Sequence, residues 1–143
     1  MKQYPSRIKY KKNHKPSSSN LYLTEKKNFS AIKGNLILVS IENGRLTYNQ
    51  IEACRKTVRR ILKKQGIVYL RVFTNISITK KPVASRMGKG KGSHHLWICL
   101  VKKGQVICEV ICYLSTTFNL GLKALKSASS KLPLKTNVCL NYY

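Results

Sequence analysis

The sequence predicts an α+β fold in which two amphipathic helices pack on one face of a mixed or antiparallel β-sheet. Short apolar runs rich in β-branched and aromatic residues indicate strands, the clearest being 36–39, 67–73, 96–101 and 106–111. Two longer segments instead repeat apolar residues at helical spacing. A hydrophobic fraction of 43% over 143 residues suffices for one core, so we expect a folded domain and not a disordered basic chain.

The first helix is expected to follow a strand at 36–39 and a turn at Asn43-Gly44. Thr47 and Gln50 have the spacing of a capping box, in which the threonine hydroxyl accepts from the Gln50 amide and the glutamine side chain reaches back. Gly66 is the expected stop. The apolar stripe is Ile51, Cys54, Val58, Ile61 and Leu62, and the other side carries Arg55, Lys56, Arg59, Arg60, Lys63 and Lys64. Such a face is often only solvated, but with Glu52 alone to offset it, contact with phosphates is favoured.

Strands at 67–73 and 76–79 should follow, and then a hairpin formed by 96–101 and 106–111. If Lys103-Gly104 is its turn, Cys99 lies opposite Cys108 and Trp97 opposite Val110.

A second helix is expected after Leu114 and should end before Pro133, with a last strand at 134–140. Its cap is one of the hydroxyl residues Ser115, Thr116 and Thr117, and its apolar side is Phe118, Leu122, Leu125, Ala128 and Leu132.

The charge of the chain points to a polyanionic partner. Twenty-eight Lys and Arg residues stand against 4 acids, which gives a net charge of +24 and a pI near 10.2. The acids are Glu25, Glu42, Glu52 and Glu109. Without any aspartate, a paired-carboxylate metal site is very hard to assemble, so we expect binding and not catalysis, with no cofactor and no metal.

The segment Arg86–Ser93 alternates glycine with lysine. Glycine lets a backbone approach a phosphate closely, and each lysine brings a cation to the same place. Taken alone, such a run can equally be a mobile solvated loop. Together with the charge of the whole chain, it predicts a protruding loop at 80–95 that lies along nucleic acid.

Residues 1–30 are expected to form a basic arm and residues 31–143 a single α+β domain that binds RNA. Arms of this kind become ordered when they lie in a groove between RNA helices. Tyr4, Tyr10 and Tyr22 can stack on bases or anchor the arm on the protein, and the sequence leaves both readings open.

The five cysteines lack the closely spaced pairs of zinc fingers, even with His94 and His95 available, and each falls in an apolar run. We expect small buried hydrophobic residues in a reducing compartment. No stretch is apolar over the ~18 residues that a membrane span requires, so no membrane contact is expected. The start of the chain leads us to expect neither a secretory signal nor an import presequence.

Six blocks of sequence, in their order and spacing, resemble the L-sixteen family of large-subunit ribosomal proteins. They are Gly44–Thr47, Gln50–Arg55, Ile67–Phe73, Thr79–Pro82, Arg86–Gly92 and Lys131–Thr136. The resemblance extends from the basic arm to about Val138.

The resemblance implies a helix-on-sheet fold bound to large-subunit rRNA beside the peptidyl transferase centre, among neighbouring ribosomal proteins. It also implies a loop that extends toward tRNA acceptor ends and helps to position A-site and P-site tRNA without catalysis. The expected rRNA-binding residues are Arg7, Lys9, Lys11, Lys12, His14, Lys15, Arg45, Arg55, Arg59, Arg71 and Lys135. Those expected near tRNA are Lys80, Lys81, Arg86, Met87, Gly88, Lys89, Gly90, Lys91 and Gly92.

Some segments depart from the family pattern. Ala31–Leu38 stands where bacterial and plastid members usually carry a glycine-rich, aromatic segment, and Pro16–Asn20 replaces a more basic stretch. This drift and the few acids favour a protein of the mitochondrial matrix ribosome over a plastid one. A free-standing RNA-binding or assembly factor is the alternative function, and an RNA-modifying enzyme is a third.

Overall fold

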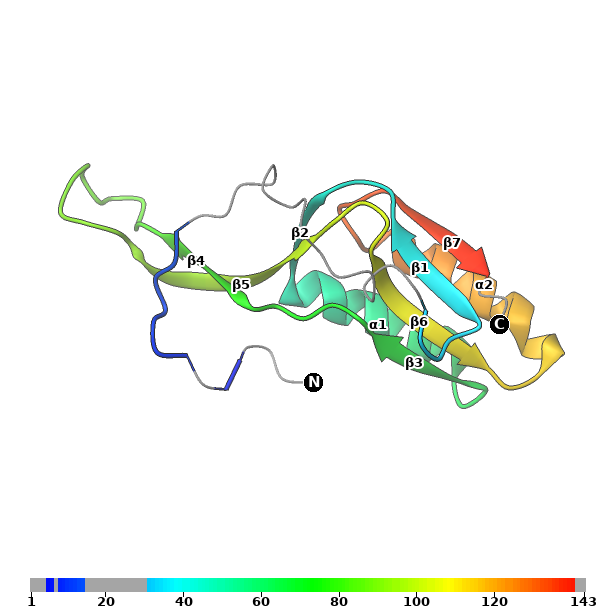
Figure 1. Ribbon diagram of the computed structural model, residues 1–143. Helices are drawn as coiled ribbons and strands as arrows, with labels where there is room; N and C mark the ends of the chain where they lie inside the picture. Colours follow the sequence, from blue (N-terminus) through cyan, green and yellow to red (C-terminus); the bar gives the residue numbers. More distant parts are fainter. Residues whose placement is uncertain (1–4, 7, 15–30, 141–143) are drawn as a thin grey trace.

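The computed structural model describes residues 5–6, 8–14 and 31–140 (Figure 1). The order of elements is β1 (Leu36–Ser40), β2 (Gly44–Thr47), α1 (Tyr48–Leu62), β3 (Gly66–Leu70), β4 (Ile76–Lys80), β5 (Ser93–Val101), β6 (Val106–Cys112), α2 (Ser115–Ser129) and β7 (Thr136–Leu140). The α+β class is confirmed. All strand pairs are antiparallel, and the strands form two sheets instead of one, ordered β3-β6-β1-β7 and β2-β5-β4.

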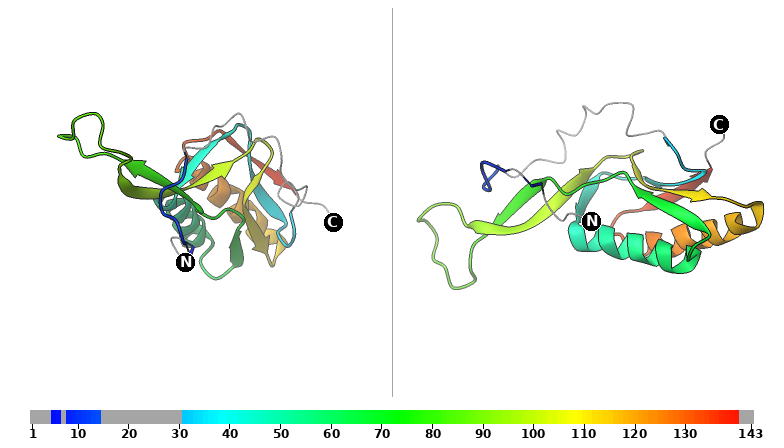
Figure 2. Two further views of the ribbon diagram at one scale, coloured as in Figure 1. Left: turned by 60° about the vertical axis from the view of Figure 1, so that its left-hand side comes forward. Right: turned by 90° about the horizontal axis from the view of Figure 1, so that it is seen from below.

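The four-stranded sheet and the two helices form the body of the molecule. Both helices lie on the same side of this sheet, as the right-hand view of Figure 2 shows, and they pack against each other. The interface buries Leu36 and Leu38 of β1, Val58 of α1, Val110 of β6 and Leu125 of α2 at zero exposure. These apolar residues come from every layer of the body, so burial of their surface holds the helices on the sheet.

The second sheet carries β4 and β5 away from the body as a long hairpin (Figures 1 and 2). Strand β2 pairs with the end of β5 nearest the body, with Leu46 opposite Cys99 and Thr47 opposite Ile98. Strand β4 pairs with the remainder, with Ser77 opposite Trp97. Each residue from 80 to 91 is exposed, so the far end of the hairpin has no core of its own.

The hairpin predicted between 96–101 and 106–111 is wrong. Cys108 lies opposite Leu38 and Leu70 in the four-stranded sheet, whereas Cys99 belongs to the three-stranded sheet. Two interactions explain the change of sheet. First, the chain continues from the turn expected at Gly44 as strand β2. This strand pairs with β5 along the edge where the prediction had placed β6. The Gly104 amide also donates to the Ser40 carbonyl at 2.7 Å, which directs the following strand onto β1.

The predicted start of α1 is confirmed in detail. The Gln50 amide donates to Thr47 Oγ1 at 3.4 Å, and the Thr47 amide donates to Gln50 Oε1 at 2.9 Å. The predicted stop at Gly66 is wrong, because the helix ends at Leu62 and Lys63 takes a positive φ of 52°. Gly66 instead begins β3, where a Cβ would meet the Ile111 carbonyl oxygen at 2.7 Å.

Helix α2 starts with Leu114 at its N-cap, and Thr117 is the hydroxyl residue that acts there. The Leu114 amide donates to Thr117 Oγ1 at 3.4 Å, so this side chain reaches back from the first turn instead of occupying the cap position. The helix ends at Ser129, four residues before Pro133. The predicted apolar side is correct for its centre, where Leu125 and Ala128 are fully buried.

Glu109 is a buried carboxylate that binds the segment just before β1. Its side chain is 1% exposed and accepts from the amides of Ile32 at 3.2 Å, Lys33 at 3.0 Å and Gly34 at 3.2 Å. Arg71 Nη1 lies 3.1 Å from Glu109 Oε1. Four donors therefore satisfy a charge that would otherwise be costly to bury.

Four of the five cysteines, Cys54, Cys99, Cys108 and Cys112, are buried thiols, as expected, and Cys139 is half-buried. Burial raises the pKa of Cys99, and the neighbouring Cys54 thiol together with burial raises the pKa of Cys108. Neither helix in the described part of the chain combines the length and apolar character that a membrane crossing requires.

Candidate nucleic-acid interface

The loop between β4 and β5 owes its shape to glycine. Gly88 and Gly90 have positive φ angles of 93° and 85°, with Lys89 between them at 54°. A Cβ at either glycine would meet nothing within 4 Å, so the constraint is the backbone conformation and not the space around it. At Gly92 the constraint is space, because a Cβ there would lie 2.6 Å from the Lys80 carbonyl oxygen.

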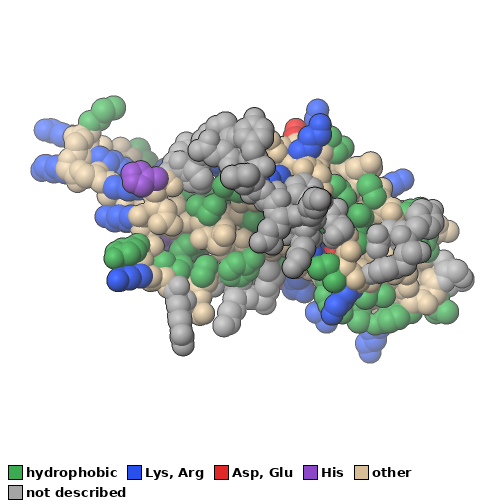
Figure 3. All heavy atoms as spheres, in the orientation of Figure 1, with side chains coloured by type: hydrophobic (Ala, Val, Ile, Leu, Met, Phe, Trp, Pro, Cys, Tyr) green, Lys and Arg blue, Asp and Glu red, His purple; other side chains and the backbone are tan. Residues whose placement is uncertain are grey.

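The cations of the loop fall into two groups. Lys81 Nζ donates to the Gly88 carbonyl at 2.6 Å, and Lys91 Nζ donates to the Asn13 carbonyl, so these two side chains bind backbone oxygens of the protein itself. Arg86 and Lys89 are exposed, as are the apolar side chains of the same loop at Val83 and Met87. Figure 3 shows several Lys and Arg side chains at this far end of the molecule, with others over the body.

Residues 8–14 of the basic arm lie beside the hairpin. Ser77 Oγ donates to the Lys11 carbonyl, and Lys12 Nζ donates to the Lys91 carbonyl at 3.4 Å. The side chains of Lys9, Lys11, Lys12 and His14 are exposed. Lys9 Nζ lies 5.5 Å from the ring centre of Tyr10, which is itself exposed. The other expected arm residues, Arg7 and Lys15, and the tyrosines Tyr4 and Tyr22 lie outside the described residues.

A basic groove lies between the end of α1 and the start of β3. Its volume is about 390 Å³, and its lining is Arg55, Arg59, Lys63, Lys64, Gly66, Ile67 and Val68. Lys63 and Lys64 were expected on the cationic side of the first helix but were not singled out among the rRNA-binding residues. The signal for them was the run of cations around the helix end, where positive side chains also complement the C-terminal end of the helix dipole.

Arg55 is partly neutralised within this groove. Its Nε donates to Glu52 Oε2 at 2.9 Å and its Nη2 to Oε1 at 2.6 Å, one helical turn away. The hydrogen bonds from Arg55 hold the pKa of Glu52 below its ordinary value. The three other cations of the groove are exposed and are the stronger candidates for phosphate contacts.

The remaining predicted residues are dispersed. Arg71, which was expected to bind rRNA, pairs with Glu109 in the body. Arg45 is half-buried on β2, opposite Leu100. Lys135 is exposed before β7, and its amide donates to Glu42 Oε1 at 2.8 Å. The structure thus gathers the loop with the arm and forms a separate groove at α1, whereas these three residues stand apart.

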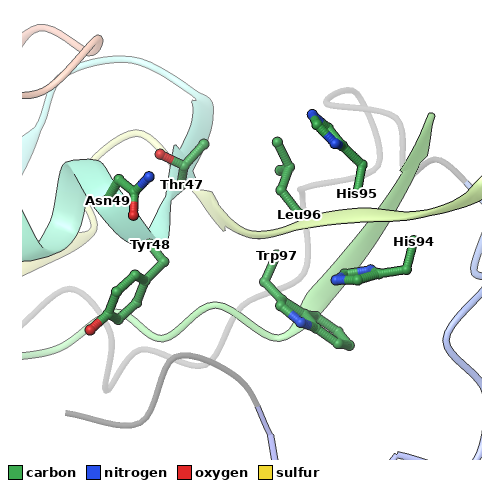
Figure 4. A pocket seen from close by; sticks show the side chains of 7 residues that line it. All are labelled: Thr47, Tyr48, Asn49, His94, His95, Leu96 and Trp97. Atoms are coloured by element: carbon green, nitrogen blue, oxygen red, sulfur yellow. The ribbon is translucent and has the colours of Figure 1, made fainter. Parts of the chain in front are cut away.

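A pocket at the base of the hairpin escaped the sequence analysis. Its volume is about 380 Å³, and Figure 4 shows the residues that line it, Thr47, Tyr48, Asn49, His94, His95, Leu96 and Trp97. The sequence interpretation placed Trp97 opposite Val110 in a hairpin, which hid its position beside the start of α1.

These features define a class: a small α+β domain that presents clustered cations on a hairpin, an arm and a groove has the surface of a nucleic-acid-binding protein. Within residues 5–6, 8–14 and 31–140, no three His, Cys, Asp or Glu residues are grouped so as to hold a metal ion.

Comparison with known proteins places the chain within this class. Residues 5–139 match the family Ribosomal protein L16p/L10e, and the chain belongs to this family. It is 44% identical over 134 residues to the large ribosomal subunit protein uL16 of Buchnera aphidicola subsp. Cinara cedri, with 92% of each chain covered. It is 40% identical to uL16 of Phytoplasma australiense, covering 94% of this chain and 93% of the relative. The uL16 of Blochmanniella floridana is 39% identical, with 94% and 96% covered.

Proposed function

We propose that this protein is a structural constituent of the large ribosomal subunit and that it contributes to translation by binding rRNA. It is not an enzyme. Membership of the L16p/L10e family over residues 5–139 carries this conclusion. The charge of +24 supports it, because a folded domain with so few acids requires a polyanion to offset its self-repulsion.

The rRNA contacts are assigned to the basic groove and the arm. In the groove, Arg59, Lys63 and Lys64 are exposed side chains on a rigid helix end, so they can reach phosphates with little ordering cost. The exposed arm residues Lys9, Lys11, Lys12 and His14 form a second basic surface beside the hairpin, and Arg7 and Lys15 of the same arm are also assigned to rRNA. Neighbouring ribosomal proteins are the expected protein partners.

The loop from Lys80 to Gly92 is assigned to tRNA acceptor ends. It projects from the body, it exposes Arg86 and Lys89, and its glycines permit close approach of a phosphate. Its contribution is to position A-site and P-site tRNA. The alternative, that the loop anchors rRNA, is distinguished by whether loop variants remain in the subunit.

The ribosome of the mitochondrial matrix is the proposed location. The sequence departures at 16–20 and 31–38 support it, whereas the relatives described above are bacterial proteins. Cell fractionation with antibodies against this chain tests it, and recovery of the chain only with non-mitochondrial ribosomes would exclude the assignment.

RNA binding is tested with a charge-matched pair of double variants. Arg59→Ala with Lys64→Ala removes two cations from the groove, and Lys123→Ala with Lys126→Ala removes two exposed cations from α2. Wild-type affinity for structured RNA should fall about a thousandfold between ~50 and ~200 mM salt. The groove variant should bind more weakly than the α2 variant in the same salt. Equal RNA affinities of the two double variants would refute the groove as an RNA-binding site. A wild-type affinity that does not change with salt would refute electrostatic binding altogether.

The alternative of a free-standing assembly factor makes a different prediction. A structural constituent sediments with mature large subunits in a sucrose gradient at high salt. An assembly factor is confined to precursor particles.

A further inference from the structure

Strand β5 contains a bulge that brings His94 and Trp97 together. Two residues three positions apart on a regular strand face opposite sides of the sheet. Here Thr79 lies opposite His94 and Ile78 opposite Leu96, so His95 is an extra residue without its own position in the ladder. As a result the rings of His94 and Trp97 lie 4.7 Å apart, centre to centre, at 45° (Figure 4).

A chain of hydrogen bonds fixes the His94 ring. Ser77 Oγ lies 2.7 Å from His94 Nδ1, and the Ser77 hydroxyl donates its proton to the Lys11 carbonyl, which can only accept. Nδ1 is therefore the donor to Ser77 Oγ. In the neutral ring, Nε2 then carries a lone pair that can accept from a ligand. Since Ser77 is 2% exposed, solvent does not compete for this arrangement.

His94 and Trp97 line two cavities of about 380 Å³ each. The first has Thr47, Tyr48 and Asn49 on its other side, at the start of α1. The second is lined by Pro5, Ser6, Ile8 and Lys11 of the arm. Both volumes lie within the rough range of 300–1,000 Å³ typical of small-molecule sites. The first combines aromatic rings with an amide and a hydroxyl, which suits a flat ligand with polar edges.

We propose that the Trp97 pocket, defined by Tyr48, Asn49, His94 and Trp97, holds an unstacked nucleobase of large-subunit rRNA. This inference rests on the proposed function. A base is a flat aromatic ring that stacks on Trp or Tyr, while its edge hydrogen-bonds to groups such as the Asn49 amide and His94 Nε2. The exposed Lys11 of the arm stands near the rings to contact the adjoining phosphates.

The position of the pocket favours rRNA over tRNA as the source of the base. The pocket extends from the first turn of α1 along β5 to His94. The exposed loop cations Arg86 and Lys89, which are assigned to tRNA, lie beyond the ends of β4 and β5, in the loop that Figure 1 shows at the far end of the hairpin. The bulge, and the hydrogen bonds that link His94 through Ser77 to the Lys11 carbonyl, also hold the His94 and Trp97 rings in place before a ligand binds. This lowers the entropic cost of binding.

Trp97 is the only tryptophan of the chain, so its fluorescence reports directly on the pocket. The full-length protein is titrated at low salt with a short oligoadenylate and with an abasic oligomer of equal length and phosphate number. The oligoadenylate should quench the emission at saturation, and the abasic oligomer should bind without quenching. Binding of both without quenching would overturn the pocket while leaving the proposed function intact. If neither binds, the proposed function fails and the pocket with it.

Substitution tests the same point without relying on quenching. Trp97→Ala should weaken binding of the oligoadenylate roughly 5- to 150-fold and leave the abasic oligomer unaffected, and Trp97→Phe should retain most of the affinity. Equal losses for both oligomers would overturn the proposal. The groove variant Arg59→Ala with Lys64→Ala serves as the control, since it should weaken both oligomers alike and leave the quenching at saturation unchanged.

The source of the base is tested in assembled large subunits by chemical probing of the rRNA without tRNA. An rRNA base should be protected in wild-type subunits and reactive in Trp97→Ala subunits that contain the protein at full occupancy. Identical reactivity throughout would overturn the proposal. Protection that appears only after tRNA is added would overturn the assignment to rRNA.

Discussion

The body and the β4–β5 hairpin are held in shape by different interactions. In the body, apolar residues from β1, β6 and both helices are buried at zero exposure, and Glu109 receives four donors. In the hairpin, backbone pairing holds the strands, the arm binds one side, and each residue from 80 to 91 is exposed. Stability is therefore concentrated in the body, so the residues of the loop are available for binding.

The largest difference between the two regions is expected for their charged residues. Glu109→Ala removes the partner of the half-buried Arg71 and leaves three amides without their acceptor, so it should lower the free energy of unfolding by about 4 kcal/mol. Arg86→Ala in the loop should change it by less than about 0.5 kcal/mol. Urea unfolding measures both values. Similar losses for the two variants would mean that the hairpin also carries stability.

Apolar residues should show the same contrast with a slightly smaller effect. Leu38→Ala leaves a cavity in the centre of β1 and should cost about 3 kcal/mol. Met87→Ala truncates a fully exposed side chain and should cost almost nothing. Thermal unfolding followed by circular dichroism compares them. A destabilised Met87→Ala variant would show that the loop packs against the protein in solution.

Features that depend on residues close in sequence were predictable, whereas those that depend on distant contacts were not. The capping box of Thr47 and Gln50 was predictable because both partners lie within one helical turn. The pairing of β6 with β1 was not, since either strand 36–40 or 93–101 offers a suitable apolar partner and the choice depends on contacts distant in sequence. The bulge at His95 could not be predicted for a related reason. It is defined by the pairing of β5 with β4, and the pattern of apolar and polar residues along β5 does not mark it.

The candidate site follows this pattern too. The loop cations and the cationic face of α1 were visible as local clusters of charge. The ion pair of Arg71 with Glu109 was not predictable, because Glu109 is distant in sequence. The Trp97 pocket requires two separate segments, the start of α1 and β5, to meet, and composition alone does not bring them together.

The loop and the body should also differ in their contribution to translation. Alanine at Arg86 and Lys89 should leave the melting temperature and the amount of protein in large subunits unchanged, because these side chains contribute no buried surface to the body. Accommodation of aminoacyl-tRNA should slow by roughly tenfold, equivalent to about 1.4 kcal/mol in the barrier. Quantitative mass spectrometry measures occupancy, and rapid kinetics measures accommodation. Loss of the variant from the subunits would identify the loop as an rRNA anchor, and full occupancy with wild-type kinetics would exclude the tRNA role.

The smallest expected effect concerns the ion pair between Glu52 and Arg55 on the surface of α1. Arg55 holds the pKa of Glu52 below its ordinary value, so Glu52 releases its proton more readily in the folded chain than in the unfolded chain. Its stabilising contribution is thus present above the ordinary pKa of a glutamate and is lost as pH falls through the lower, folded value. Because the pair lies at the surface, the contribution should be only about 0.3–0.5 kcal/mol.

Glu52→Gln tests this when its unfolding free energy is subtracted from that of the wild type at each pH. The difference should be constant above about pH 5, shrink toward zero at lower pH and diminish in high salt. The corresponding substitution in the body, Glu109→Gln, should remain destabilising in high salt, because the Glu109 carboxylate is itself buried. A Glu52→Gln difference as large and as insensitive to salt as that of Glu109→Gln would place α1's outer face within the stabilising part of the molecule, and would therefore argue against its assignment as an RNA-binding surface.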